Sequence, residues 1–446
     1  MTLSEIAQAV NGKLISSQPG GPETAVSSVS IDTRTITPGA LYVPIIGDRY
    51  DGHAFIAAAR ENGAVCTLSD RQLPNGPYIL VPDTLRALQD LASHYRDKFD
   101  IPVIGVTGSV GKTSTKEMLA AVLSTRFHTL KNVGSYNNHT GVPLTLLRLE
   151  REHEVAVIEM GTNHFGEIDN LASIAKPTVC LFTNIGVAHI EFFGSREGIL
   201  KGKTEMLAHK KPGGAVIVNG DDDMLVRVEG AMRYGFSEGC HVRAVDAVDH
   251  GLTGSEFVAC YEGQRVPVTV PSPGRHSVSN ALAAIAVGLT LGMSLQELAV
   301  GVAAFEPPNG RMCIRRTERL TVLDDSYNAN PNSVMASIDV LEKVPGRKVC
   351  VLGDMLELGD QSDEYHEVVG MYAARHGIDL IVCVGPSSEQ TFLGAHAIAP
   401  HGARYFENQD SMAGILPQLI RNGDTILIKA ARGIHLENTV QMLLEL

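Results

Sequence analysis

The sequence predicts an α/β protein made of three compact domains. At 446 residues the chain is too long for a single core. Short apolar runs alternate with helix-like segments, which is typical of parallel sheets covered by helices on both faces. This alternation restarts at "DIPVIGVTG" (100–108) and again after "PPNGRM" (307–312). We therefore expect domains over residues 1–98, 99–313 and 314–446.

The first domain combines short strands with one long helix. The segments "VSSVSIDTR" (26–34) and "ALYVPII" (40–46) alternate in polarity, which favours half-buried strands. The stretch "LRALQDLASHYRDKF" (85–99) has a helical pattern. Together they indicate a small α/β domain.

The second domain opens with an apolar strand that runs directly into a glycine-rich turn. Further buried strands are expected at "VAVIEMG" (155–161), "TVCLFTNIG" (178–186) and "GGAVIVNGD" (213–221), separated by helix-like segments. Residues 240–270 change to an alternating, β-rich pattern, which indicates an antiparallel side sheet. Residues 272–292 return to a helical pattern.

The third domain has four strand candidates, each followed by polar or glycine residues. They are "LTVLDDSY" (320–327), "RKVCVLGDM" (347–355), "IDLIVCVG" (378–385) and "DTILIKAARG" (424–433). Ligands of open parallel sheets bind beyond the carboxyl ends of the strands. We therefore expect binding residues at these four positions.

The segment "GSVGKTS" (108–114) joins a predicted strand to a helix that starts with Lys and Thr. Such a turn aims backbone N–H groups at one point, and the helix N-terminus adds partial positive charge. Lys112 can reach the β- and γ-phosphates of a nucleotide, and the Thr113 hydroxyl can ligate Mg²⁺. The general motif is G-x-x-x-x-G-K-[ST], and Val106 stands where its first glycine would be. We predict an ATP- or GTP-binding loop formed by Gly108, Ser109, Val110, Gly111, Lys112, Thr113 and Ser114.

The loop alone does not choose among kinases, GTPases, ATPases and ligases. The base-reading Asn-Lys-x-Asp of a GTPase does not occur in the sequence. The strand at 155–161 ends in Glu159, whose carboxylate can hold a cation as an Asp would. His189 follows the next strand, where a structural hydrogen-bonding role is the more common one for a lone histidine. Lys201 and Lys203, taken alone, are interpreted as solvent-facing residues of a helix.

Charge and composition exclude other classes of function. A net charge of −13 argues against non-specific nucleic-acid binding. The N-terminus lacks the pattern of a secretory signal, and the most apolar stretch, residues 281–295, is shorter than the roughly 20 residues that a bilayer span needs. The seven cysteines are scattered without a CxxC pair, as is typical of reduced thiols in a cytosol. We expect a cytoplasmic protein without a membrane span.

Eight segments along the whole chain carry a resemblance to a known family. They are "VTGSVGKTS", "NNHTGVPLTLL", "EMGTNHFGEI", "NIGVAHIEFFGS", "KGKTEM", "NALAAIAVG", "DDSYNANPNS" and "VLGDMLELG". Together they resemble the Mur ligase family. "DSYNANP" and "LGDMLELG" are the most specific, and they are similar to the members that add D-alanyl-D-alanine to UDP-N-acetylmuramoyl-tripeptide. The glycine loop and "NALAA" are shared more widely, including with folylpolyglutamate synthases.

The resemblance implies a UDP-substrate domain, a central P-loop ATPase domain and a C-terminal Rossmann-like domain. It implies a peptide-bond-forming ligase of peptidoglycan precursor synthesis that uses ATP and two Mg²⁺ ions. By analogy Lys112 contacts the transferred phosphate, Thr113 and Glu159 hold one Mg²⁺, and His189 holds the second. The lysine that matches Lys203 is carbamylated in the family, since CO₂ converts a cationic amine into a carboxylate that can help to fix Mg²⁺.

The resemblance also implies the remaining binding residues. The nucleotide residues are Asn280, Arg311, Asp325 and Tyr327. The substrate residues are Thr33, Arg34 and His53 in the segments 30–34 and 47–55, with Asn137, Asn138 and Asn328 near the reacting groups. "DMLELG" and "KAARG" (429–433) would lie near the incoming dipeptide, although two alanines replace the Gly and Ser that the family often has in the latter.

The implied reaction passes through an acyl phosphate. The carboxylate of the tripeptide attacks the γ-phosphate of ATP, and the amine of the dipeptide then displaces phosphate. The sequence identifies no base for that amine, nor whether the third residue of the tripeptide is lysine or diaminopimelate. We expect a monomer. The alternatives left open are another Mur-type or folylpolyglutamate-synthase-like amino-acid ligase, and an ATPase switch that acts on a partner protein.

Overall fold

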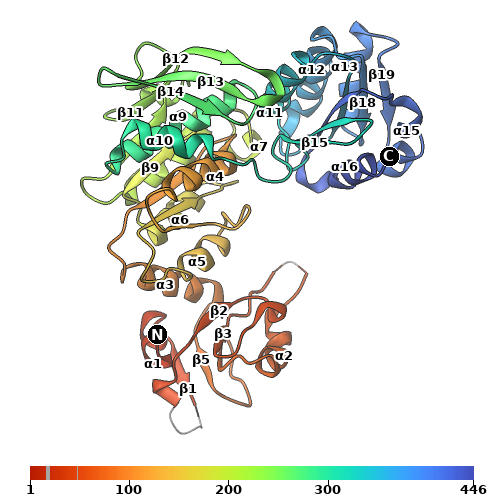
Figure 1. The fold of residues 1–446 in the computed structure, drawn as a ribbon. Helices are drawn as coiled ribbons and strands as arrows, with labels where there is room; N and C mark the ends of the chain where they lie inside the picture. Colours follow the sequence, from red (N-terminus) through yellow and green to blue (C-terminus); the bar gives the residue numbers. More distant parts are fainter. Residues whose placement is uncertain (17–20, 48) are drawn as a thin grey trace.

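The computed structural model describes residues 1–16, 21–47 and 49–446, whose strands form three sheets (Figure 1). The sheets have five, nine and six strands and follow one another along the chain, each with its own helices.

Asp48, part of the predicted 47–55 segment, lies outside the described residues. Helix α3 (Thr84–Arg96) buries Leu91 in the first core and Ala92 in the second. The domain boundaries near residues 98 and 313 stay predictions.

The first sheet is small and has the order β1-β5-β4-β3-β2. Its elements are α1 (Leu3–Ala9), β1 (Lys13–Ile15), η1 (Gly21–Glu23), β2 (Ser28–Ser30), η2 (Thr33–Thr35), β3 (Ala40–Tyr42), η3 (Gly52–Phe55), α2 (Ile56–Glu61), β4 (Cys66–Ser69), β5 (Tyr78–Leu80) and α3. The strand expected over residues 26–34 is shorter, because the Asp32 carboxylate accepts the N–H of Arg34 at 2.9 Å and starts the 3₁₀ turn η2.

The second sheet has the order β14-β13-β12-β11-β10-β9-β6-β8-β7. Its strands are β6 (Val103–Thr107), β7 (Thr129–Lys131), β8 (Val155–Glu159), β9 (Val179–Phe182), β10 (Ala215–Asn219), β11 (Met232–Gly235), β12 (Val242–Asp249), β13 (Ser255–Tyr261) and β14 (Gln264–Val270). The helices are α4 (Lys112–Leu123), α5 (Gly141–Leu146), α6 (Glu167–Ala175), α7 (Ile190–Phe193), α8 (Arg196–Thr204), η4 (Glu205–His209), η5 (Leu225–Arg227), η6 (Gly251–Thr253), α9 (Arg275–Thr290) and α10 (Leu295–Ala303).

The antiparallel strands β12–β14 do not form a separate side sheet, so that prediction is wrong. Tyr234 of β11 pairs in parallel with Val242 of β12, and the antiparallel ladder therefore continues the central sheet. The parallel strands are buried on both faces. Ile104 and Val106 of β6 pack in the core with α4 and α9, whereas Val103 faces α5 and α6 on the other side.

The third sheet has the order β15-β16-β20-β17-β18-β19. Its elements are β15 (Cys313–Arg316), β16 (Thr321–Asp324), α11 (Pro331–Glu342), β17 (Lys348–Gly353), η7 (Gly359–Gln361), α12 (Ser362–Arg375), β18 (Leu380–Val384), α13 (Ser388–Ile398), β19 (Ala403–Phe406), α14 (Gln409–Ala413), α15 (Leu416–Leu419), β20 (Thr425–Lys429), η8 (Arg432–Ile434) and α16 (Glu437–Leu444). All neighbours are parallel except β15, which pairs antiparallel with β16. The alternation did not predict the short strands β15 and β19.

The three sheets are arranged with the second in the middle. Figure 1 shows the first sheet at one end, below α3, α5 and α6, and the third sheet beside the central one. Among the described residues, no helix is long and apolar enough to cross a membrane.

Candidate active site

A cavity of about 1010 Å³ lies where the carboxyl ends of the central and third sheets meet. The predicted residues that line it are Ser109, Val110, Gly111, Lys112, Thr113, Ser114, Asn137, Asn138, Glu159, His189, Asn280, Arg311, Asp325, Tyr327 and Asn328. Gly108 lies beside this lining. The described lining does not include Lys203, Thr33, Arg34 or His53.

The glycine loop between β6 and α4 is held by the residues after β9. Asn184 accepts the N–H of Ser109 at its backbone oxygen and the N–H of Val110 at its Oδ1, both at 2.9 Å. Gly108 has a φ of +156°, and a Cβ there would lie 1.9 Å from Oγ1 of Thr183. Only glycine fits this approach. Because these two amides are already bonded, the first N–H groups of α4 are the ones left for an anion.

Lys112 bends back over the loop that precedes it. Its Nζ donates to the backbone oxygens of Gly108 at 2.8 Å and Ser109 at 3.3 Å. Burial lowers the pKa of Lys112, and the negative charge of Glu159 opposes that effect. An entering phosphate would be a stronger partner than two carbonyl oxygens, because both groups would carry charge.

Glu159, at the end of β8, is buried and surrounded by polar groups. Its Oε1 accepts hydrogen bonds from Oγ1 of Thr113 at 3.1 Å and Nδ2 of Asn137 at 2.6 Å. Its Oε2 has no hydrogen-bond partner among the described residues, and Nζ of Lys116 is 3.8 Å away. A buried carboxylate oxygen without a partner beside a threonine hydroxyl fits the oxygen-ligand preference of Mg²⁺.

His189 lies beyond β9 and contacts a residue of the third sheet. Its Nδ1 is 2.5 Å from Oε2 of Glu357, but the contact lacks hydrogen-bond geometry, so Nδ1 has no hydrogen-bond partner in the described part of the chain. Both residues have positive φ, +63° and +64°. The contact with His189 lowers the pKa of the Glu357 carboxyl, whereas burial acts in the opposite direction.

Lys203 is fully buried in α8, so the solvent-facing interpretation is wrong for this residue. Its Nζ has no hydrogen-bond partner among the residues that the structure describes. Burial lowers the pKa of Lys203 well below its ordinary value, and the positive charge of Lys112 lowers it further. Lys201 differs, because it is exposed and its Nζ lies 5.7 Å from the centre of the Phe165 ring. The environment of Lys203 favours a neutral amine.

Asp325 follows β16 and is fixed by three donors. Its Oδ1 accepts the N–H of Met312 at 3.1 Å, and its Oδ2 accepts from Oγ of Ser337 at 2.6 Å and Nζ of Lys429 at 2.5 Å. Burial lowers the pKa of Lys429, and Asp325 opposes this. The carboxylate is therefore held rigidly at the cavity wall, with remaining lone pairs for a further donor.

Arg311 and Tyr327 bring the third sheet into contact with the glycine loop. The guanidinium carbon of Arg311 lies 4.1 Å from the centre of the Tyr327 ring, and that of Arg432 lies 5.2 Å from it. Nη2 of Arg311 donates to Oγ1 of Thr113 at 3.2 Å, and the Tyr327 hydroxyl bonds to Oγ of Ser135.

Asn138, Asn280 and Asn328 each accept a hydrogen bond from the protein at the side-chain oxygen. Asn138 accepts the N–H of Gly141 at 2.9 Å, at the start of α5. Asn280 on α9 accepts from Oγ1 of Thr115 at 3.0 Å, which ties α9 to α4. Asn328 accepts the N–H of Ala329 at 3.0 Å. These bonds set the direction of each amide.

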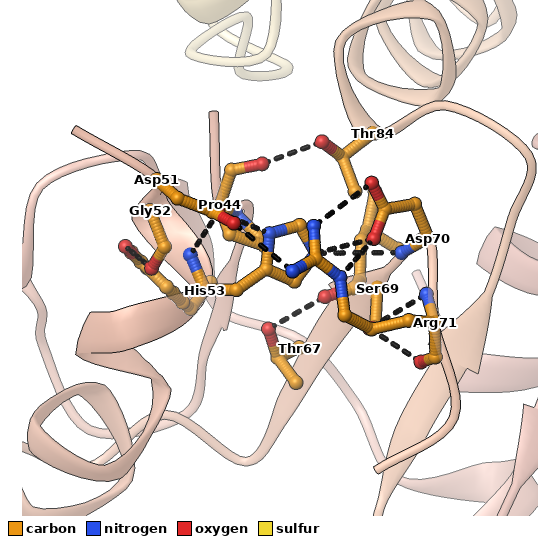
Figure 2. Close-up of polar contacts among 11 residues, drawn as sticks. Pro44, Asp51, Gly52, His53, Thr67, Ser69, Asp70, Arg71 and Thr84 are labelled. Carbon is orange, nitrogen blue, oxygen red and sulfur yellow. Dashed lines mark hydrogen bonds and ion pairs between the residues drawn. The ribbon is translucent and has the colours of Figure 1, made fainter. Parts of the chain in front are cut away.

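His53 lies in a network of charged groups on the first sheet, shown in Figure 2. Its Nδ1 is 2.7 Å from Oδ1 of Asp51, and its Nε2 is 3.2 Å from Oδ1 of Asp70. Arg71 pairs with both carboxylates. The His53 side chain is only 6% exposed, so it braces the two loops that carry Asp51 and Asp70. A contact between His53 and the substrate stays a prediction.

Thr33 and Arg34 lie in η2, apart from the cavity. Arg34 has an 87% exposed side chain that pairs with Asp32 at 2.6 Å. Asp32 raises the pKa of Arg34 most, and Tyr136 of the central unit adds a weaker effect. Ser135 and Asn137, the chain neighbours of Tyr136, line the cavity.

One buried cation beside the site was missed by sequence reasoning. Lys116 is fully buried, and its Nζ donates to the backbone oxygens of Asn132 at 3.1 Å and Gly134 at 2.5 Å. Its position four residues after Lys112 on a predicted helix was the available signal, because such residues share a face. Glu357 belongs to the "DMLELG" segment that the resemblance implies near the dipeptide, but no local pattern indicates that it meets His189.

Comparisons with known proteins match this chain to Mur ligases in each of its three parts. The family models described as "Mur ligase family, catalytic domain", "Mur ligase middle domain" and "Mur ligase, glutamate ligase domain" match residues 25–96, 106–288 and 310–432. The UDP-N-acetylmuramoyl-tripeptide--D-alanyl-D-alanine ligase of Bacillus subtilis is 37% identical, with 100% of this chain and 98% of that protein covered.

The chain is also similar to solved structures of Mur ligases. A MurF structure from Acinetobacter baumannii has a TM-score of 0.93 at 34% identity and covers 100% of this chain and 99% of its own. A MurF ligase from Thermotoga maritima in complex with ADP has a TM-score of 0.84 at 29% identity and covers 95% of this chain and 97% of its own.

Proposed function

Because this chain belongs to the Mur ligase family, we propose that it is the ATP-dependent ligase that joins D-alanyl-D-alanine to UDP-N-acetylmuramoyl-tripeptide in peptidoglycan precursor synthesis. Relatives of that name match over its full length. The observation that carries the proposal is the grouping of Lys112, Thr113 and Glu159 at adjacent strand ends, with Arg311 of the third sheet bonded to Thr113.

ATP would place its phosphates against the start of α4. The free N–H groups of the first helical turn and the Lys112 ammonium supply positive charge there. Lys112 would exchange the carbonyl oxygens of the loop for the γ-phosphate. The remaining nucleotide contacts would come from Asn280, Arg311, Asp325 and Tyr327. Of these, Arg311 already reaches Thr113 across the cavity, at 3.2 Å.

The donor set fits Mg²⁺, which the resemblance implies. Thr113 and Glu159 would hold one ion, since Oε2 of Glu159 is buried without a hydrogen-bond partner among the described residues. His189 would hold a second. Bound Mg²⁺ would neutralise phosphate charge, so that a carboxylate can approach the triphosphate.

We infer that Lys203 is carbamylated. Its amine is buried without a hydrogen-bond partner in the described part of the chain, and burial lowers its pKa, which favours the neutral form that reacts with CO₂. The N-carboxylated product would be an anion in a region that already contains the cation Lys112. The carbamate would supply a carboxylate for the metal site, and the charges of Lys112 and of a bound Mg²⁺ would offset its own.

The tripeptide would enter between the first and central sheets. Thr33, Arg34 and His53 would act on the UDP side, and Asn137, Asn138 and Asn328 near the reacting carboxylate. That carboxylate attacks the γ-phosphate and forms an acyl phosphate and ADP. The neutral dipeptide amine would then attack the acyl carbon and form the amide bond, phosphate would leave with the electron pair of the broken C–O bond, and the amine nitrogen would lose a proton to solvent. The protein contributes positioning and charge neutralisation.

The test is phosphate release by the purified protein with ATP, Mg²⁺ and UDP-N-acetylmuramoyl-tripeptide, with and without D-alanyl-D-alanine. Phosphate release should require all components, and mass spectrometry should show the tripeptide extended by the dipeptide. Parallel assays with lysine or diaminopimelate in the tripeptide would define its third residue. Equal turnover with a single amino acid, or turnover without the tripeptide, would contradict the proposal.

We also propose the cytoplasm as its location, because ATP is consumed there, and a monomer as its functional unit. The three-domain division at residues 98 and 313 belongs to the same proposal, and the three matched family regions support it. Light scattering of the purified protein tests the oligomeric state.

A further inference from the structure

A buried lysine joins the phosphate-binding helix α4 to the segment 132–139, which follows β7. Lys116 lies on α4 and is fully buried. Its Nζ donates to the backbone oxygens of Asn132 at 3.1 Å and Gly134 at 2.5 Å, and it lies 2.9 Å from Oε1 of Glu117. Because an ammonium group has three N–H donors, these three acceptors are enough to occupy all of them.

The segment 132–139 is also fixed to the end of β8. Oδ1 of Asn132 accepts the N–H of Glu159 at 2.7 Å, and Nδ2 of Asn132 donates to the backbone oxygen of Tyr136 at 2.6 Å. Further along, Nδ2 of Asn137 donates to Oε1 of Glu159 at 2.6 Å. The segment is therefore held between β8 and α4, and Lys116 makes two of the hydrogen bonds on the α4 side.

The segment 132–139 forms part of the cavity wall and contacts the other two sheets' elements. Its residues that line the cavity are Ser135, Asn137, Asn138 and His139. The Ser135 hydroxyl bonds to that of Tyr327 in the third unit, and the His139 backbone oxygen accepts from Nε2 of Gln89 on α3 at 3.2 Å. The segment thus lies between α3 and the third sheet, where the proposed function places the reacting end of the tripeptide.

The first chemical step depends on the distance between this segment and the start of α4. ATP would bind with its phosphates at the first turn of α4 and at Lys112, whereas the tripeptide would bind beside Asn137. An attacking oxygen has to come within about 3–3.5 Å of the phosphorus, and an error of about 1 Å can lower the rate about 100-fold. Lys116 follows Lys112 by about one turn on the same rigid helix, so it ties the segment to the phosphate site.

We propose that Lys116 is a positioning residue for the tripeptide. It fixes the segment 132–139 against α4, so that the substrate carboxylate is presented to the γ-phosphate. This rests on the proposed function and deepens it, because it assigns the orientation of the tripeptide to a residue outside the described lining of the cavity. Lys116 acts through the segment and contributes to the use of the tripeptide, not to the binding of ATP.

The test compares Lys116→Met with wild-type protein and with Lys131→Met. Lys131 is the matched control, because it pairs with the same Glu117 carboxylate but is exposed. Lys116→Met should raise the KM for UDP-N-acetylmuramoyl-tripeptide by about tenfold or more, since the backbone oxygens of Asn132 and Gly134 lose a buried donor. The Kd of a non-hydrolysable ATP analogue should change by less than about threefold, and Lys131→Met should resemble wild type in both values.

A second variant, Lys116→Gln, separates positioning from folding. Its amide N–H groups can still donate to a backbone oxygen, so its KM for the tripeptide should lie between those of wild type and Lys116→Met. It also serves as the test should Lys116→Met not fold. The KM is measured on protein whose folded fraction is known from circular dichroism.

Two outcomes would overturn the inference. A lysine needed only for folding would lower the Tm of the variants and leave the tripeptide KM of the folded molecules unchanged. A rise in the Kd of the ATP analogue as large as the rise in the tripeptide KM would make Lys116 part of the nucleotide site. Failure of the wild-type protein to extend the tripeptide would instead reject the proposed function.

Discussion

Several side chains in the cavity wall or in the segments beside it occupy positions that oppose folding. Lys203 is buried without a hydrogen-bond partner among the described residues, and so is Oε2 of Glu159. Each unpaired buried polar group costs roughly 1–3 kcal/mol. His189 and Glu357 add backbone strain through their positive φ angles. Such costs are tolerated where groups must stay available to a ligand, although buried groups without a partner also occur elsewhere in the described chain, for example Nε of Arg60 and Oε2 of Glu437.

Replacement of Lys203 tests the carbamate directly. Lys203→Ala should lower phosphate release at saturating substrates by about 100-fold or more, because the site loses its added anion. A small carboxylic acid such as acetate should restore part of the rate, since it fits the space left by the side chain. The measurement is the rate of phosphate release over a series of acetate concentrations.

Lys201→Ala is the control for this experiment. Lys201 lies on the same helix but is exposed, so its replacement should leave the rate within about twofold of wild type. Normal turnover of Lys203→Ala without any additive would remove Lys203 from the mechanism.

At the scale of elements, the conformation of the loop after β17 is held by a hydrogen bond to a neutral histidine. Nε2 of His366 accepts the N–H of Met355 at 3.0 Å, while its Nδ1 donates to the Ser362 backbone oxygen at 2.8 Å. Burial lowers the pKa of His366, against the opposing charges of Asp354 and Asp363. A protonated His366 could not accept the Met355 hydrogen bond. The position of Glu357 therefore depends on a buried, uncharged ring.

The sign of the resulting pH dependence follows from linkage. Below the ordinary histidine pKa of about 6.5, the unfolded chain binds a proton at His366 that the folded chain does not. Stability should therefore fall as the pH drops from about 6.5 towards the lowered pKa. Hydrogen exchange of residues 350–358 should show less protection at pH 5.5 than at pH 7.5, after correction for intrinsic rates.

His366→Leu is the comparison variant for this prediction. It leaves the Met355 N–H without its acceptor, so protection of residues 350–358 should fall at pH 7.5, by about 1–3 kcal/mol. The difference between wild type and variant should shrink at pH 5.5. A difference that stays constant between the two pH values would contradict the linkage argument.

For the whole molecule, one cavity is assembled from two sheets. The glycine loop and Glu159 come from the central sheet, whereas Arg311, Asp325 and Tyr327 belong to the segments around β15 and β16. The Thr113–Arg311 and Ser135–Tyr327 contacts cross between them. A nucleotide in this cavity should therefore stabilise both units, while the first sheet stays unaffected.

Hydrogen exchange with a non-hydrolysable ATP analogue and Mg²⁺ tests this coupling. At 100 times its Kd, a ligand stabilises the state that binds it by about 2.7 kcal/mol. Residues 108–114 and 325–328 should gain protection together, and residues 51–71 should not. Protection confined to residues 108–114 would show that the third sheet does not share the nucleotide.

Much of the fold was predictable from local patterns. The buried strands β6, β8, β9 and β10 and the glycine loop were found because a parallel strand is apolar throughout and the loop has a fixed spacing of Gly, Lys and Thr. The short edge strands β15 and β19 were missed, since four residues carry too little pattern. The antiparallel ladder was found, but its pairing with β11 depends on contacts between distant segments.

The amino-acid sequence was sufficient to predict the α/β class, the phosphate-binding loop and the family resemblance, because each depends on neighbouring residues and their spacing. It could not show that Lys203 is buried while Lys201 is exposed, or that Glu357 reaches His189 from another sheet. Burial and cross-sheet contacts arise only when distant segments pack together. The pKa of an amine and the partner of a carboxylate are set by that packing, so these features depended on the folded chain.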